Sequence, residues 1–221
     1  MNMNRLWSLN LEHNHLTASD PTLIAWLDNI NPNWATTQTA CSETAQKDEI
    51  IIDFGAPYGI WMRMNNSNWL KLHRRSSDSI ETADLDGNGQ DEVIIDFGDP
   101  YGIWVRMNNS SWTHLDTQSP DSIKTGDLDG NGQDEAIVDF CDADGLWIWM
   151  NNTNWVQLDS RSPEKLITGE LNGNGQDDII IDFGTDGLWL WMNNSDWVSL
   201  HQNSSESLST GDIDGSGQDD I

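Results

Sequence analysis

Acidic and amide side chains recur at set positions of a nine-residue segment, and these are the residues of the chain best suited to chemistry. The segment DLDGNGQDE occurs at Asp84–Glu92 and again, unchanged, at Asp127–Glu135; related copies lie at Glu170–Asp178 and Asp212–Asp220. Oxygen-bearing side chains occupy positions one, three, five and nine, while glycine at positions four and six permits a sharp backbone turn. Calcium takes roughly six to eight oxygen ligands, and a tight loop with this alternation can supply most of them.

Each of these segments is therefore predicted to be a Ca2+ loop. The side chains at positions one, three, five and nine are the predicted ligands, together with the backbone carbonyl of the glutamine at position seven. The set comprises Asp84, Asp86, Asn88, Gln90 and Glu92 in the first loop, Asp127, Asp129, Asn131, Gln133 and Glu135 in the second, Glu170, Asn172, Asn174, Gln176 and Asp178 in the third, and Asp212, Asp214, Ser216, Gln218 and Asp220 in the fourth. Because the third loop has one carboxylate fewer and the fourth has serine at position five, we expect the first two loops to fill first.

The position of the closing acid separates these loops from the EF-hand. An EF-hand needs a bidentate glutamate at position twelve and a helix on each side, but position twelve here is Ile95 or Val138. The acid instead stands at position nine, directly before an apolar run that ends in Asp-Phe-Gly in the first loop's unit. This DxDGxGxDE loop resembles the FG-GAP or VCBS-type calcium-binding repeat of integrin-like β-propellers, from about residue 48 to the end. The resemblance implies a calcium-binding propeller that acts in adhesion or interaction.

The elements that must position these loops repeat about every 43 residues, as the series Asp53, Asp96, Asp139 and Asp182 shows. The second unit contains strand candidates at Ser79–Ala83, Glu92–Phe97, Gly102–Met107 and Trp112–Leu115, separated by segments rich in Gly, Pro, Asn and Ser. Four short antiparallel strands form one propeller blade, and repeats of roughly 40 to 50 residues are typical of blades. We therefore predict an all-β fold, a β-propeller of four-stranded antiparallel blades.

The two ends of the chain leave alternatives open. Residues 1–47 form an N-terminal extension, with either a short helix after Pro21 or a degenerate repeat whose loop position is Cys41–Glu49. Residues 48–221 contain the repeats, and the predicted last strand, Leu208–Gly211, has no following strand within its own unit. It could complete the first blade of the same chain, complete the blade of another copy in a head-to-tail ring or filament, or belong to a longer propeller.

The formal net charge of -27 argues against nucleic acid and anionic membranes as partners, because both require a basic surface. Thirteen tryptophans argue for a packed core rather than disorder. No apolar stretch approaches the roughly twenty residues of a membrane span. The first residues lack the apolar segment of a secretory signal, so an extracellular or cell-surface location requires another export route or a signal further upstream.

The other recurrent residues have two interpretations each. The tryptophans of GIWVRM and GLWIWM are expected to pack between blades, with sugar platforms as the alternative. The NNS and NNT segments are expected to be hairpin turns, with glycosylation as the alternative. Neither HExxH nor GxSxG occurs, so no enzyme is predicted. The expected function is a non-enzymatic calcium-binding adhesion or interaction module with a protein or glycan partner; the alternatives are a self-assembling structural subunit and a lectin.

Overall fold

The computed structural model describes residues 21–30, 49–65, 67–141 and 144–221. A short helix, α1 (Pro21–Ile30), occupies the first of these ranges. Proline suits the first helical position, because its φ is already helical and the N–H it lacks would have no partner there. The alternative of a degenerate loop at Cys41–Glu49 falls, except for Glu49, outside the described residues. By compactness, α1 and Arg63–Leu70 belong to a smaller unit, and Ile51–Met62 with Lys71–Ile221 to a larger one.

Almost all remaining regular structure is β-sheet, which confirms the all-β prediction. The first sheet has three strands in chain order: β1 (Ile50–Asp53), β2 (Ile60–Met64) and β3 (Asn68–His73). The second sheet consists of β4 (Ser79–Ala83), β5 (Glu92–Asp96), β6 (Ile103–Met107) and β7 (Ser111–Asp116). The third consists of β8 (Ser122–Gly126), β9 (Glu135–Asp139), β10 (Leu146–Met150) and β11 (Asn154–Asp159). The fourth consists of β12 (Lys165–Gly169), β13 (Asp178–Asp182), β14 (Leu188–Met192) and β15 (Asp196–His201), with a 3-10 turn, η1 (Gly184–Asp186), before β14.

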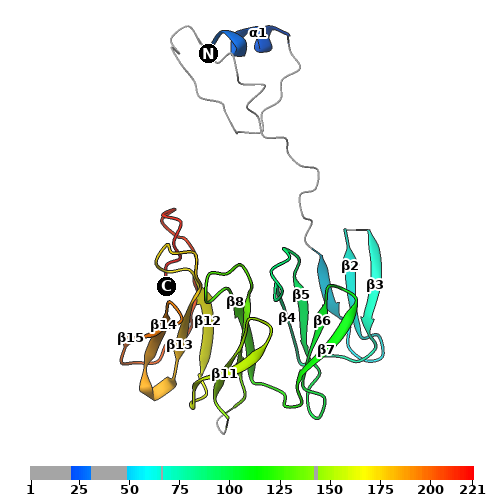
Figure 1. The fold of residues 1–221 in the computed structure, drawn as a ribbon, viewed down its shortest axis with the longest axis vertical. Helices are drawn as coiled ribbons and strands as arrows, with labels where there is room; N and C mark the ends of the chain where they lie inside the picture. The colour runs from blue at the N-terminus through cyan, green and yellow to red at the C-terminus, as the bar shows by residue number, and fades with distance from the viewer. Residues whose placement is uncertain (1–20, 31–48, 66, 142–143) are drawn as a thin grey trace. The chain divides into compact units, whose positions relative to one another are not determined.

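The three four-stranded sheets are antiparallel meanders with the same register. In each, the first strand pairs with the second over its full length, as β4 does with β5. The third strand carries a bulge opposite the fourth, at the same place in β6, β10 and β14. Within the larger unit these sheets stand side by side in chain order (Figure 1). The predicted strands of the second unit are present, with ends that differ by one residue at most.

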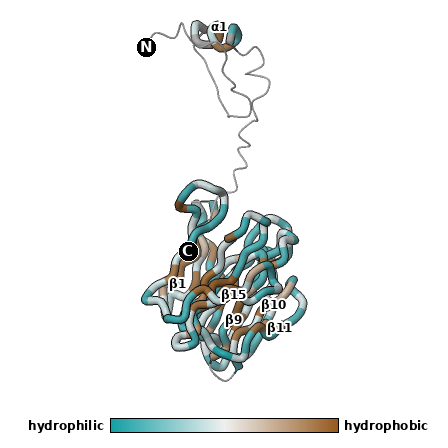
Figure 2. Tube along the Cα trace, turned by 90° about the vertical axis from the view of Figure 1, so that its left-hand side faces the viewer, coloured by the Kyte–Doolittle hydropathy of each residue, from teal (hydrophilic) through white to brown (hydrophobic). Residues whose placement is uncertain are grey.

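The core lies between consecutive sheets, so each central strand is buried on both faces. Every residue of β5, β9 and β13 is buried. In β5, Ile94 packs with Val138 of β9, whereas Val93 and Ile95 pack on the opposite side with Ile60 of β2. Two-sided burial explains why these strands read as continuous apolar runs rather than alternating ones. Figure 2 shows hydrophobic residues along strands such as β9 and mostly hydrophilic loops.

Seven of the tryptophans pack against these cores: Trp112, Trp147, Trp149, Trp155, Trp189, Trp191 and Trp197. Trp149 and Trp155 are partly buried against the core between the second and third sheets, with ring centroids 5.2 Å apart. In β6, Trp104 and Arg106 are half-buried while Ile103 is fully buried, which is the alternation predicted from the sequence. Packing is thus the structural role of these rings.

The paired asparagines form the turns between the third and fourth strands. Both residues have positive φ at Asn108–Asn109 (45° and 55°) and at Asn151–Asn152 (47° and 51°), and Asn193–Asn194 behaves in the same way. A two-residue hairpin turn with both central residues in the left-handed region suits the twist of the strands, and asparagine tolerates that region well. The turn interpretation of the NNS and NNT segments is therefore supported.

An aspartate ends β1, β5, β9 and β13, buried in the last three and partly buried at Asp53, and accepts hydrogen bonds from a serine that follows the last strand of its sheet. At Asp96 the Ser119 hydroxyl donates at 2.7 Å and the Gly98 N–H at 2.9 Å. At Asp53, Ser77 additionally donates its N–H at 2.7 Å. The residue of the second unit that corresponds to Ser77 is Pro120, which has neither a backbone N–H nor a hydroxyl to donate to Asp96. Burial raises the pKa of Asp96, whereas at Asp53 the larger set of hydrogen bonds outweighs burial and lowers the pKa.

The Pro120→Ser variant is therefore expected to lower the pKa of Asp96. The new N–H and hydroxyl favour the carboxylate form, and each charge-assisted bond of this kind shifts a pKa by on the order of one unit. A carboxyl-detected NMR titration of Asp96 measures the shift directly. Pro120→Ala is the control, because it restores the N–H but not the hydroxyl and should give a smaller decrease. An unchanged pKa in both variants would contradict this explanation.

The predicted strand at Leu208–Gly211 is not formed, and this expectation was wrong. Only an isolated bridge joins Gly211 to Asp220. A strand requires consecutive backbone pairs, and the described residues offer this segment none beyond that bridge. The Thr210 hydroxyl does donate to the Thr168 carbonyl at 2.9 Å, as Thr168 does to Thr125 in the preceding unit.

Candidate metal centres

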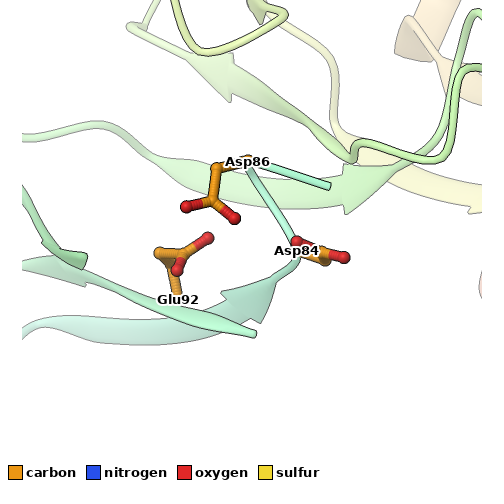
Figure 3. A group of neighbouring side chains, drawn as sticks. All are labelled: Asp84, Asp86 and Glu92. Atoms are coloured by element: carbon orange, nitrogen blue, oxygen red, sulfur yellow. The ribbon is translucent and has the colours of Figure 1, made fainter. Parts of the chain in front are cut away.

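The first loop brings its three acidic predicted ligands together between β4 and β5. Oxygen atoms of Asp84, Asp86 and Glu92 all lie within 4.8 Å of one another. The carboxylates of Asp86 and Glu92 face each other, with Asp84 at the start of the loop (Figure 3). Glu92 is fully buried at the start of β5 and accepts the Leu85 N–H at 3.0 Å. Burial raises the pKa of Glu92, with the charges of Asp86 and Asp84 adding to the effect.

The second loop repeats this arrangement with Asp127, Asp129 and Glu135. Burial raises the pKa of Glu135 to about 7; the N–H groups of Leu128 and Asn151 oppose this, while Asp129 and Asp127 add to it. The Oδ1 atom of Asp129 is buried and has no hydrogen-bond partner. A buried oxygen without a partner is costly, and a bound cation would satisfy it.

The remaining two loops differ from these. In the fourth loop Asp212, Asp214 and Asp220 are also within 4.8 Å of one another, but all three are exposed. In the third loop the Glu170 Oε1 accepts the N–H of Asn172 at 3.0 Å and of Asn174 at 3.1 Å. Asn172 in place of an aspartate leaves this loop with two acidic predicted ligands, Glu170 and Asp178, so its expected affinity remains below that of the first two.

The amide residues of the loops do not all present free oxygens. The Oδ1 of Asn88 accepts the Gln90 N–H at 2.8 Å, and Asn131 and Asn174 make the same contact with Gln133 and Gln176 at 2.7 Å. Ser216 accepts the Gln218 N–H at 3.3 Å through its hydroxyl. The side chain at position five therefore also stabilises the turn that contains the residue at position seven. Its role as a ligand stays a prediction.

The first asparagine of the NN turns at Asn108, Asn151 and Asn193 contacts the predicted loops, and the sequence did not reveal this. Asn108 donates its N–H to Glu92 at 3.1 Å and its side-chain amide to Asp86 at 2.7 Å. The Asn88 amide in turn donates to the Asn108 Oδ1 at 2.6 Å. Asn151 makes the same contacts with Glu135 at 3.1 Å and Asp129 at 2.9 Å. The only available signal was that an NN pair follows each of the first three loops at nearly the same distance, 16 residues after Glu92 and Glu135 and 15 after Asp178.

We expect Asn108→Ala to weaken Ca2+ binding by the first loop about tenfold, because a hydrogen bond to a charged group contributes about 1.5 to 3 kcal/mol. Asn109→Ala is the matched control, since it removes the neighbouring positive-φ asparagine without touching the loop acids. Isothermal titration calorimetry of both variants measures the difference. Equal losses in the two variants would assign the effect to the turn rather than to the side-chain contact.

Comparison with known proteins shows similarity to a solved structure. The sequence matches no protein-family model and no curated protein. A solved structure of a lectin from Agrocybe aegerita, described as recognising non-reducing terminal N-acetylglucosamine, is similar with a TM-score of 0.51 and 19% sequence identity. The alignment covers 76% of this chain and 50% of that lectin, so the chain matches about half of the lectin's length. At this identity the likeness concerns the all-β fold alone.

Among the described residues no helix is long and apolar enough to cross a membrane.

Proposed function

We propose that this protein is a non-enzymatic, calcium-stabilised binding module built as a β-propeller of FG-GAP or VCBS-type repeats. The observation that carries the proposal is the repeated acid triad, with oxygens of Asp84, Asp86 and Glu92 within 4.8 Å of one another, and of the equivalent acids in two further loops. The proposed propeller arrangement is supported by the repeat length and by the side-by-side order of the four-stranded sheets. An extracellular location agrees with sites that require abundant Ca2+.

The chemistry of the donor set favours a hard divalent cation. Three carboxylates at such short separations repel one another unless a cation neutralises them. The Asp129 Oδ1 lacks a hydrogen-bond partner. The other two members of its triad, Asp127 and Glu135, are also carboxylates, which accept hydrogen bonds and bind cations. All predicted ligands are oxygens, which suits Ca2+ or Mg2+, and a loop with several carboxylates and amides suits the larger and less strictly octahedral Ca2+.

Calorimetric titration with Ca2+ and separately with Mg2+ tests the metal proposal. We expect Ca2+ to bind at more than one site, with Asp84→Ala and Asp127→Ala each removing one of the tighter sites. Mg2+ should bind more weakly. A wild-type protein that takes up no Ca2+ at millimolar concentration would refute the proposal.

Carbohydrate is the ligand class that we propose for the module. The supporting observation is the similar structure of an N-acetylglucosamine-recognising lectin, together with a surface that offers exposed aromatic rings such as Tyr58 and Tyr101, 66% and 43% exposed. Flat rings with polar edges suit sugar faces. A glycan array read in Ca2+ and in chelator tests this. Binding of terminal N-acetylglucosamine in Ca2+ would support a lectin. No binding to any glycan on the array would contradict the carbohydrate proposal and favour a protein partner.

A further inference from the structure

The first and second predicted metal loops are each bonded by two residues of the next loop along the chain. The Asp134 N–H donates to the Asp84 carbonyl at 2.8 Å, and the Asp84 N–H donates to the Asp134 Oδ2 at 2.9 Å. The Gln133 amide donates to the Asp86 carbonyl at 3.1 Å. Gln133 and Asp134 belong to the second loop, whereas Asp84 and Asp86 are predicted ligands in the first.

The contact repeats along the chain. Asp177 and Asp127 exchange the same pair of bonds at 2.8 Å and 3.0 Å, and the Gln176 amide donates to the Asp129 carbonyl at 2.9 Å. Asp219 and Glu170 exchange theirs at 2.6 Å and 3.2 Å. The aspartate at position eight therefore bonds the backbone of a ligand residue one loop earlier in all three cases, and the glutamine at position seven does so in the first two.

Glycine at position four makes room for this contact. A Cβ on Gly87 would lie 2.9 Å from the Gln133 Cγ, and one on Gly130 would lie 2.9 Å from the Gln176 Cγ. A Cβ on Gly89, by contrast, would meet nothing within 4 Å. The two glycines of the motif thus serve different purposes, since only the first admits the neighbouring loop.

We infer that the Gln–Asp pair of each loop consists of positioning residues for the preceding metal loop, so that neighbouring loops bind cations cooperatively. The inference rests on the proposed Ca2+ sites. Asp134 directly precedes Glu135, a predicted ligand of its own loop, so a cation bound there orders Asp134 and with it the backbone of Asp84. Coupling of this kind is reciprocal, and a cation in the first loop favours binding in the second to the same extent.

A site-resolved Ca2+ titration tests the inference. In full-length protein labelled with 15N-glycine, the amide signals of Gly89 and Gly132 report on the first and second loops. We expect Asp134→Ala to weaken binding at Gly89 about tenfold, because it removes a hydrogen bond to a charged carboxylate, and Gln133→Ala about threefold, because it removes one between uncharged groups.

Asp91→Ala is the matched control. Like Asp134, Asp91 is an aspartate at position eight of the motif, but it lies in the first loop itself. Its substitution therefore removes a negative charge near the first site and leaves the contact between the first and second loops in place. We expect Asp91→Ala to change the Ca2+ affinity at Gly89 less than threefold. A loss equal to that of Asp134→Ala would overturn the inference, as would an unchanged Gly89 affinity in Asp134→Ala.

The Asp134→Asn variant keeps an acceptor for the Asp84 N–H and replaces the alanine variant if that variant does not fold. It should weaken binding about threefold, and a tenfold loss there would assign the effect to charge. A wild-type protein whose Gly89 and Gly132 signals do not respond to Ca2+ would refute the metal sites themselves, which is a different result.

Discussion

Removal of Ca2+ is expected to lower the melting temperature of the protein by on the order of 15 to 30 °C. A site held at 100 times its dissociation constant contributes about 2.7 kcal/mol, and three such sites approach the roughly 5 to 15 kcal/mol of a typical domain. For about 200 residues, each kcal/mol corresponds to about 2 to 4 °C. Without the cation, the acids of each triad repel one another, and the net charge of -27 disfavours the compact state.

Thermal melts followed by circular dichroism, in millimolar Ca2+ and in chelator, measure this effect. Asp127→Ala provides the internal comparison, because it should lower the melting temperature in Ca2+ and change it little in chelator. Refilling with Mg2+ should restore less stability than Ca2+. Superimposable wild-type curves in the two buffers would exclude a structural role for the metal.

The Asp182→Asn variant is expected to lose about 2 kcal/mol of unfolding free energy at neutral pH. Asp182 is fully buried at the end of β13, and Ser205 donates to it through both its N–H and its hydroxyl, each at 2.7 Å. Burial raises its pKa, but these bonds, with those from Gly184 and Ser204, outweigh burial and lower the pKa to about 2. The decrease from 3.8 corresponds to about 2 kcal/mol at about 1.4 kcal/mol per unit.

The sign of this shift defines the pH range of the effect. Because the folded-state pKa lies below the unfolded value, the stabilisation is fully present above about pH 4 and is lost as the pH falls through about 2. Urea unfolding from pH 7 to pH 2 should show the wild-type and Asp182→Asn curves converging over that range. Asp186→Asn is the control, since Asp186 is 57% exposed in its ion pair with Arg161 and should cost below about 1 kcal/mol. A wild-type advantage that stays constant down to pH 2 would contradict the assignment.

The repeat and its strands could be predicted from the amino-acid sequence alone. The period of 43 residues, the apolar runs such as Glu92–Phe97 and the turn-forming residues between them are local signals, and local signals specify elements and their order. The loop acids were also readable, because a metal loop draws most of its ligands from a few adjacent residues. The predicted acids of the first, second and fourth loops do lie together.

Only the tertiary structure revealed the contacts between segments distant in sequence. Asn108 reaches Asp86 across a hairpin, and Asp134 holds Asp84 from a different sheet. Neither partner can be read from spacing, because the register of the strands and the stacking of the sheets determine which turns meet which loops. The failure of Leu208–Gly211 to form a strand has the same cause, since a strand depends on a partner that its own residues do not encode.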